Sequence, residues 1–336
     1  MANTNTAPDF SALERIAKPR VKQLGQLQTS NHLLGDRDAL NRFWEENGYW
    51  FFKKILDQDV IRQLRDIWID LLQRRGLIDP GVNENRYNGA PIREELGLLP
   101  EFNERDIQRL LTENASIQAT FKKILGDDPF WLSIAEYRAN APGSDPDANR
   151  FIFPHQDGFY SRDMPMRICW IPVDNMDADV GGCAFVEGSN RGPLLHDLNQ
   201  PPFFAIPAEN LPSDNWKVAD YEPGDVVMFD LNTLHSGLTN ISKDRFRMSF
   251  DIRVTEASGP VPSIGNVVSL TEDRVTLRNR QTQAEETYAI NDYTYVRGNN
   301  GKKRVGKDIP MTFDPGDLII VNSKDGKSAT LVRATH

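Results

Sequence analysis

The sequence FPHQDGF at residues 153–159 places a histidine and a carboxylate two positions apart, just after a loop rich in proline, glycine and aspartate. We expect a strand over residues 151–157, and side chains two apart in a strand point to the same face. His155 and Asp157 can then bind one ion together. A third ligand would complete a facial triad of two histidines and one carboxylate, the set that holds a non-haem Fe(II) and leaves positions open for substrate and oxygen.

The best candidate for the third ligand is His235. It closes the sequence DVVMFDLNTLH at residues 225–235, in which a predicted apolar strand ends in a histidine. An HxD pair alone occurs by chance in many proteins, and the alternative is an ordinary polar pair at the edge of a loop. A histidine at the end of a later strand is where a jelly-roll metal site needs its distal ligand.

A second signal follows this histidine. The sequence RFRMSFDIRV at residues 245–254 alternates between polar and apolar side chains without a break, which predicts a strand. Its polar face carries Arg245, Arg247 and Arg253. Such a face is commonly solvated. It can instead line a barrel interior, where a guanidinium binds a dicarboxylate co-substrate through two parallel hydrogen bonds.

Composition sets the broad class. The chain has 336 residues with 39% hydrophobic and 26% charged content, as in ordinary globular proteins. A net charge of -9 argues against nucleic acid as a partner, and no apolar run reaches the roughly 20 residues of a membrane helix. The polar N-terminus does not read as a secretory signal. Cys169 and Cys183, the only cysteines, are expected to be buried free thiols, which favours a cytoplasmic location.

The chain divides into three expected parts. Residues 1–35 are predicted to form a mobile N-terminal arm, and residues 36–255 a catalytic domain. This domain starts with helices and continues as short strands, which predicts a mainly β fold with helices, a double-stranded β-helix (jelly roll) with helices packed on one face. Residues 256–336 have no predicted helix and are expected to form a small β-barrel-like module. Two similar turns, EPGD at 222–225 and DPGD at 314–317, indicate shared turn chemistry only.

Several motifs together resemble the phytanoyl-CoA dioxygenase family of Fe(II)/2-oxoglutarate oxygenases, over roughly residues 38–254. The resemblance is carried by the following segments: FWEENGY at 43–49, PHQDG at 154–158, WIPVD at 170–174, GG at 181–182, VEGSN at 186–190, EPGD at 222–225, and His235 with NIS at 240–242. The C-terminal module lies outside it.

The resemblance implies that His155, Asp157 and His235 bind iron, and that an arginine after the distal histidine binds the 5-carboxylate of 2-oxoglutarate. The family's usual position, eleven residues on, is Phe246 here. A one-residue insertion in the preceding turn would bring Arg247 into place, and Arg245 is the second choice. Gln156 and Trp170 are further candidates for cofactor contact, with a core position as the alternative for Trp170.

Two departures concern other positions. Many family members carry serine two residues after the distal histidine, where this chain has Gly237. The family's common Gly-Ser-His is Gly188-Ser189-Asn190 here, which we interpret as a structural turn.

The implied cofactors are Fe(II), 2-oxoglutarate and O2. The implied activity is oxidation of an unactivated C–H bond of a small molecule, a secondary metabolite or an amino-acid-like compound, with release of succinate and CO2. Hydroxylation is the expected outcome; desaturation, epoxidation and cyclisation share its chemistry. A carboxylate at 157 argues against a related halogenase. The rivals are a non-catalytic jelly-roll binding protein and a 2-oxoglutarate-independent cupin-type or zinc metalloenzyme. The module is expected to support a homodimer, to cover the active site, or to do neither.

Overall fold

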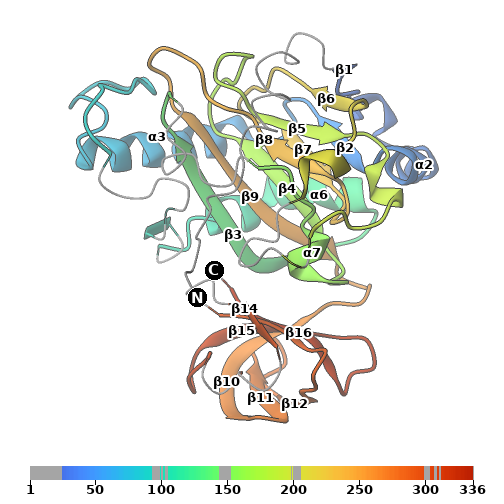
Figure 1. Cartoon of the computed structure of the whole chain (residues 1–336). Helices are drawn as coiled ribbons and strands as arrows, with labels where there is room; N and C mark the ends of the chain where they lie inside the picture. The colour runs from blue at the N-terminus through green and yellow to red at the C-terminus, as the bar shows by residue number, and fades with distance from the viewer. Residues whose placement is uncertain are drawn as a thin grey trace.

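The computed structural model describes residues 25–92, 99, 101–102, 105–143, 153–197, 199, 206–298, 303–305, 309 and 312–335. They form a larger body, in which helices lie against strands, and a smaller body built from a sheet (Figure 1). The described helices are α2 (Arg37–Asn47), α3 (Gln58–Arg74), α5 (Arg109–Thr112), α6 (Ala115–Leu125) and α7 (Gly158–Ser161), with short 3-10 turns η1 (Asn31–Leu33), η2 (Ser189–Arg191) and η3 (Ala208–Asn210).

The larger body contains two sheets. One has five strands in the order β2 (Tyr49–Phe52), β7 (Val226–Phe229), β4 (Arg167–Pro172), β9 (Arg247–Glu256) and β3 (Pro129–Asn140). The other has four strands in the order β1 (Gly25–Gln26), β6 (Trp216–Val218), β5 (Cys183–Val186) and β8 (His235–Gly237).

Two helices of the larger body, α2 and α3, start at aspartate caps. The Asp36 side chain accepts a hydrogen bond from the Ala39 amide and caps α2, and Asp57 caps α3 in the same way. Helix α2 ends at Gly48, which adopts the left-handed conformation that closes many helices. Strand β2 follows at once, so the cap sets the direction in which the chain enters the sheet.

Alternation along the strands divides the core into two layers. In β2, Trp50 and Phe52 pack with the helices, whereas Tyr49 and Phe51 pack between the two sheets. Phe185 of the four-stranded sheet meets Phe229 of the five-stranded sheet with ring centroids 5.1 Å apart. Two facing, mainly antiparallel sheets with helices on one outer face confirm the predicted jelly roll.

The C-terminal strands form a separate seven-stranded sheet. Its order is β12 (Glu285–Ala289), β11 (Arg274–Asn279), β10 (Ser263–Thr271), β15 (Leu318–Ser323), β16 (Ala329–Ala334), β13 (Tyr295–Arg297) and β14 (Lys303–Val305). The sheet curves strongly below the larger body in Figure 1 and surrounds its own apolar core, which includes Val275, Leu277 and Phe313.

The two similar turns are confirmed as shared turn chemistry. Gly224 and Gly316 have φ values of 91° and 97°, which favour glycine. In each turn the aspartate amide donates to the carbonyl three residues earlier, at 3.0 Å for Asp225 and 3.1 Å for Asp317. Each aspartate carboxylate accepts the amide of that same earlier residue, at 2.9 Å. Both turns feed a buried strand, β7 and β15.

The described part of the predicted N-terminal arm lies against the larger body. Gly25–Gln26 pairs in parallel with β6, and Leu27 and Ser30 are buried. Residues 1–24 of the arm are outside the described residues.

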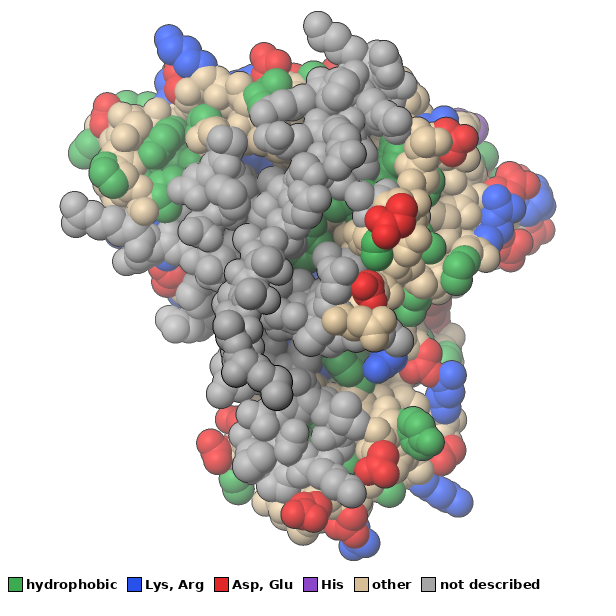
Figure 2. All heavy atoms as spheres, viewed as in Figure 1, with side chains coloured by type: hydrophobic (Ala, Val, Ile, Leu, Met, Phe, Trp, Pro, Cys, Tyr) green, Lys and Arg blue, Asp and Glu red, His purple; other side chains and the backbone are tan. Residues whose placement is uncertain are grey.

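Among the described helices, none has the length and apolar character needed to cross a membrane. On the face shown in Figure 2, described acidic and basic side chains are interspersed.

Candidate metal centre

His155, Asp157 and His235 lie together in the structure, with one ligand atom of each within 4.8 Å of the others. His155 Nε2 is 3.7 Å from Asp157 Oδ1, and the two imidazole centroids are 4.2 Å apart. The two histidine backbones form an isolated antiparallel bridge, with amide-to-carbonyl distances of 2.9 and 3.0 Å. Residues 80 positions apart in the chain are thus locked side by side.

The local backbone differs from the strand predicted over 151–157. Residues 151–152 are outside the described residues, His155 makes only the single bridge, and Asp157 has helical dihedral angles of −64° and −24° at the start of α7. The reason is that Gly158 donates its amide to the Leu231 carbonyl at 2.7 Å, which turns the chain into α7. The carboxylate therefore reaches the histidines by a turn, and not by strand alternation.

Hydrogen bonds at Nδ1 orient both imidazoles. His155 Nδ1 lies 2.8 Å from the Phe153 carbonyl, and His235 Nδ1 lies 3.0 Å from the Thr233 carbonyl. A carbonyl can only accept, so each Nδ1 carries the proton and each Nε2 presents a lone pair. This is the tautomer that a metal ligand needs.

The charges of the three groups also suit a cation. Burial lowers the pKa of His155 to about 4, with a further contribution from His235, and burial lowers the pKa of His235 as well. Burial alone would raise the pKa of Asp157, but His235, His155 and Arg253 outweigh it and hold that pKa below its ordinary value. Two neutral imidazoles and one carboxylate therefore face the same point, and these residue types fit Fe(II).

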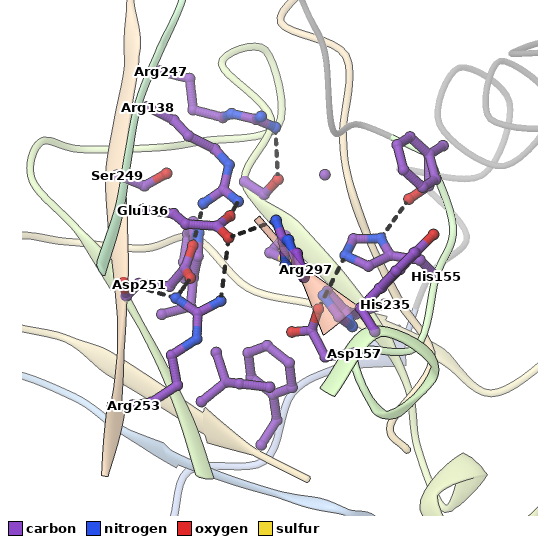
Figure 3. Close-up of a pocket in the computed structure, with 18 residues that line it drawn as sticks. Glu136, Arg138, His155, Asp157, His235, Arg247, Ser249, Asp251, Arg253 and Arg297 are labelled. Carbon is purple, nitrogen blue, oxygen red and sulfur yellow. Dashed lines mark hydrogen bonds and ion pairs between the residues drawn. The ribbon is translucent and has the colours of Figure 1, made fainter. Parts of the chain in front are cut away.

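The triad lies at one side of a cavity of about 220 Å³ in the larger body (Figure 3). The polar face of β9 lines the opposite side through Arg247, Ser249, Asp251 and Arg253. Apolar residues of the other face, such as Met248 and Phe250, pack against the helices. The arginine-bearing face of this strand is thus interior.

Arg247 and Arg245 have different environments. Arg247 is only 3% exposed and lines the cavity. Arg245 forms an ion pair with Asp177 at 2.8 Å on the surface and is not among the cavity-lining residues. The geometry favours Arg247 as the anion-binding residue.

The structure separates the two other predicted contact residues. Trp170 lines the cavity and packs edge-on against Tyr221, with ring centroids 4.8 Å apart. Gln156 does not line it. The Gln156 side chain donates to the Asn232 carbonyl at 2.8 Å and accepts the Leu195 amide at 2.8 Å, so it joins the loops around the triad. The predicted cofactor contact of Gln156 stays a prediction.

Sequence reasoning missed a buried ionic cluster in the same cavity. Its members are Glu136 and Arg138 of β3, Asp251 and Arg253 of β9, and Arg297 of β13. Arg138 bridges Glu136 and Asp251, and Arg253 also pairs with Asp251. The i,i+2 spacing in β3 was a visible signal for a polar strand face. Nothing in the sequence placed Arg297 beside it.

Comparison with known proteins gives the family. The model of the phytanoyl-CoA dioxygenase (PhyH) family matches residues 44–249, more than half of the chain. The chain belongs to this family. This confirms the predicted resemblance, and with the His-Asp-His group it identifies the chain as an enzyme of the Fe(II)/2-oxoglutarate oxygenase type.

Two curated relatives of this PhyH member carry the name 1-deoxypentalenic acid 11-beta-hydroxylase. The protein of Streptomyces exfoliatus is 29% identical over 243 residues, and that of Streptomyces arenae is 30% identical over 240 residues. Each alignment covers 67% of this chain and 83% of the relative.

Solved structures of low sequence identity match a similar fraction of this chain. EctD from S. alaskensis in its apoform has a TM-score of 0.48 at 16% identity, covering 71% of this chain and 82% of that chain. The carbocyclase SnoK from nogalamycin biosynthesis has a TM-score of 0.47 at 18% identity, covering 69% and 88%.

Proposed function

We propose that this PhyH member hydroxylates a small organic molecule, with His155, Asp157 and His235 holding Fe(II) and Arg247 binding the far carboxylate of 2-oxoglutarate. The bound metal and co-substrate supply, with O2, the oxidising chemistry that replaces a C–H bond by C–OH and releases succinate and CO2. One observation carries the proposal: a buried guanidinium, which has no carboxylate partner among the described residues, lines the same cavity as the triad.

The contacts of Arg247 support this role. Its Nε and Nη2 donate to Asn140 Oδ1 at 3.0 and 2.7 Å, and its Nη1 donates to the carbonyls of Leu238 at 2.8 Å and Gly182 at 3.1 Å. All these acceptors are neutral. Burial lowers the pKa of Arg247 to about 10, so it remains charged at neutral pH. A buried charge is costly unless an anion pairs with it, and a carboxylate of the co-substrate would supply that pairing.

The protein's other tasks are orientation and exclusion of water. The carbonyls of Phe153 and Thr233 fix the imidazole tautomers, and the ring of Phe229 packs 4.6 Å from that of His235. Apolar walls from Ile168 and Trp170 limit solvent around the reacting carbon. Holding the substrate in one orientation selects which C–H bond is oxidised.

The substrate class follows from the relatives. Both curated relatives are named as hydroxylases of a small carboxylic acid. We therefore propose a secondary metabolite as substrate ahead of an amino-acid-like compound, with hydroxylation as the outcome.

Substrate-independent turnover of 2-oxoglutarate tests the proposal. Purified protein with Fe(II), O2 and ascorbate should convert 2-oxoglutarate to succinate, and Asp157→Ala should abolish this conversion. Arg247→Ala should raise the KM for 2-oxoglutarate strongly. A cupin-type or zinc enzyme would be insensitive to Arg247→Ala, and a binding protein would form no succinate in any variant.

Three further predictions concern organisation. We propose that residues 36–255 form the catalytic domain and residues 256–336 an appended module, with residues 1–35 as an arm. A homodimer through the module and a cytoplasmic location also stay predictions, which light scattering and cell fractionation would check.

A further inference from the structure

One face of the C-terminal sheet is turned toward the larger body, which contains the candidate metal centre and is called the catalytic body below. Tyr295, Ile320 and Leu331 pack in the same apolar cluster as Leu132, Met164 and Met166 of that body. Their neighbours in sequence, Val296, Ile319 and Val332, pack in the sheet's own core. Since side chains alternate along a strand, Arg297 and Arg333 share the inward face with Tyr295 and Leu331. The sheet is thus an integral wall of the catalytic body.

Polar contacts hold this wall in register. The guanidinium of Arg162 lies 5.0 Å above the ring of Tyr295, and Asn322 Nδ2 donates to Asp163 Oδ1 at 3.4 Å. Lys324 forms an ion pair with Asp163. An apolar contact flanked by such pairs positions β13 on the cavity, and Figure 3 shows Arg297 among the cavity side chains.

Arg297 and Arg333 are direct neighbours on the parallel strands β13 and β16. Like charges opposite one another in a sheet are destabilising. Arg333 is 2% exposed, and burial with the charges of Arg297 and Arg253 lowers its pKa to about 9. Two adjacent arginines on the inward face are stabilised if a negatively charged group lies in the cavity beside them.

Among the described residues, the carboxylates that line the cavity do not balance its arginines. Four arginines of this part of the chain line it, Arg138, Arg247, Arg253 and Arg297, against the three carboxylates of Glu136, Asp157 and Asp251. Fe(II) and the 2-oxoglutarate dianion cancel one another when bound, so one positive charge remains, before Arg333 behind the wall is counted. Arginines outweigh burial and hold the pKa of Glu136 far below its usual range, so this carboxylate is already fully ionised.

Of the three arginines in the ionic cluster, Arg138, Arg253 and Arg297, Arg297 has the weakest contact with a carboxylate. Its Nη2 lies 3.8 Å from Glu136 Oε1, beyond hydrogen-bond distance, and a quarter of its side chain is exposed. Glu136 is already paired with Arg138. Among the described residues, Glu136 is the only ion-pair partner of Arg297, so its guanidinium retains donors for a ligand.

We propose that Arg297 binds a carboxylate of the organic substrate, so that the C-terminal sheet is part of the active site and selects monoanionic substrates. This rests on the proposed function, because the charge balance assumes bound Fe(II) and 2-oxoglutarate. A carboxylate between Arg297 and the triad would neutralise the remaining charge. It would also fix one end of the substrate while the other end is presented to the metal.

Matched acids and amides test the proposal without knowledge of the natural substrate. The probes are adamantane-1-carboxylate with its carboxamide, and hexanoate with hexanamide, so that one rigid and one flexible pair are covered. Binding is measured by anaerobic calorimetry on the full chain loaded with Fe(II) and 2-oxoglutarate. Wild type should bind at least one acid about tenfold or more tightly than its amide, as one charge-assisted contact allows.

Variants at the wall identify the residue responsible. Arg297→Gln should reduce the acid preference to about threefold or less, and Arg297→Lys should restore part of it. Arg278→Gln is the matched control, because it removes an arginine charge from the same sheet at an exposed position, where Arg278 pairs with Glu285 outside the cavity. It should keep the full preference.

The outcomes separate this inference from the proposed function. Failure of wild type to bind either acid, equal affinity for acid and amide, or an unchanged preference in Arg297→Gln would overturn the role of Arg297. If Arg297→Gln still forms succinate from 2-oxoglutarate, the substitution affects binding of the organic substrate and not of the co-substrate. Absence of that turnover in wild type would instead contradict the proposed function.

Discussion

Arg247 donates two hydrogen bonds to one oxygen of Asn140, from Nε at 3.0 Å and from Nη2 at 2.7 Å. Asn140 is the last residue of β3, and it pairs in register with Arg247, the first residue of β9. The Asn140 side-chain oxygen therefore fixes the plane of the Arg247 guanidinium at the end of the β3–β9 strand pair. The Asn140 side-chain nitrogen is buried without a hydrogen-bond partner among the described residues, so it is a second donor beside the proposed carboxylate site.

Arg247→Met is expected to separate stability from ligand binding. Methionine replaces the buried charge by an apolar side chain, which is often neutral or stabilising. The ligand-free variant should therefore have a Tm equal to or above that of wild type, or a few degrees below it if the neutral acceptors are left unpaired. Addition of 2-oxoglutarate with Fe(II) should raise the Tm of wild type and leave that of the variant unchanged. A similar ligand-induced shift in both would contradict the assignment.

Asp157→Ala should lower Fe(II) affinity by about 100-fold or more, because it removes a charged metal ligand. Loss of a residue that only supports a metal ligand already lowers metal affinity by about 10- to 100-fold. Equilibrium metal binding under anaerobic conditions measures this change. Asp177→Ala is the matched control, since Asp177 pairs with Arg245 on the surface. Equal metal affinity in the two variants would rule out the carboxylate of Asp157 as a ligand.

The metal-free protein should lose stability as the pH falls. His155 has a folded pKa of about 4, below the value near 6.5 of an exposed histidine, so the unfolded chain binds more protons between these values. Its contribution is present above about pH 6.5 and is lost toward about pH 4, with an upper limit of about 3 kcal/mol. Urea unfolding at about pH 7 and about pH 5 measures it. His155→Asn should reduce the loss, and an equal loss would contradict this origin.

Gly182→Ala should disturb both the fold and the co-substrate site. A Cβ at Gly182 would lie 2.6 Å from Tyr221 Cε2, and the Tyr221 ring is buried and bound through its hydroxyl to the Cys183 carbonyl. The ring cannot move freely, so we expect a loss of about 1–3 kcal/mol in unfolding free energy. The KM for 2-oxoglutarate should also rise, because the Gly182 carbonyl accepts from Arg247. Gly259→Ala, with its nearest contact at 3.4 Å, should change neither.

Local sequence signals predicted the parts of the fold that depend on neighbouring residues. Helices in the N-terminal part of the catalytic domain were expected, and Asp36, Asp57 and Gly48 form their ends because caps act within one turn. The alternation over 245–254 predicted β9, and its polar face proved to line the cavity. Cys169 and Cys183 are buried free thiols, as predicted.

Tertiary contacts decided the features that sequence reasoning missed. Asp157 was expected in a strand, but the hydrogen bond from Gly158 to Leu231, 73 residues away in sequence, turns it into a helical backbone. Arg297 enters the cavity because β13 pairs with β16 and the sheet packs on the catalytic body. Strand β13 has only three residues, Tyr295–Arg297, and a segment this short shows no periodicity that could indicate which face Arg297 occupies.

The most direct test of the central claim is an anaerobic titration of 2-oxoglutarate into the Fe(II)-loaded protein, followed by the visible charge-transfer absorption of the chelate. Arg245→Ala is the control for Arg247→Ala, because the two arginines flank Phe246 and only Arg247 lines the cavity. Wild type and Arg245→Ala should give the absorption with similar affinity, and Arg247→Ala should bind 2-oxoglutarate about 10- to 100-fold more weakly. Equal affinity in all three proteins, or no absorption in wild type, would contradict the account.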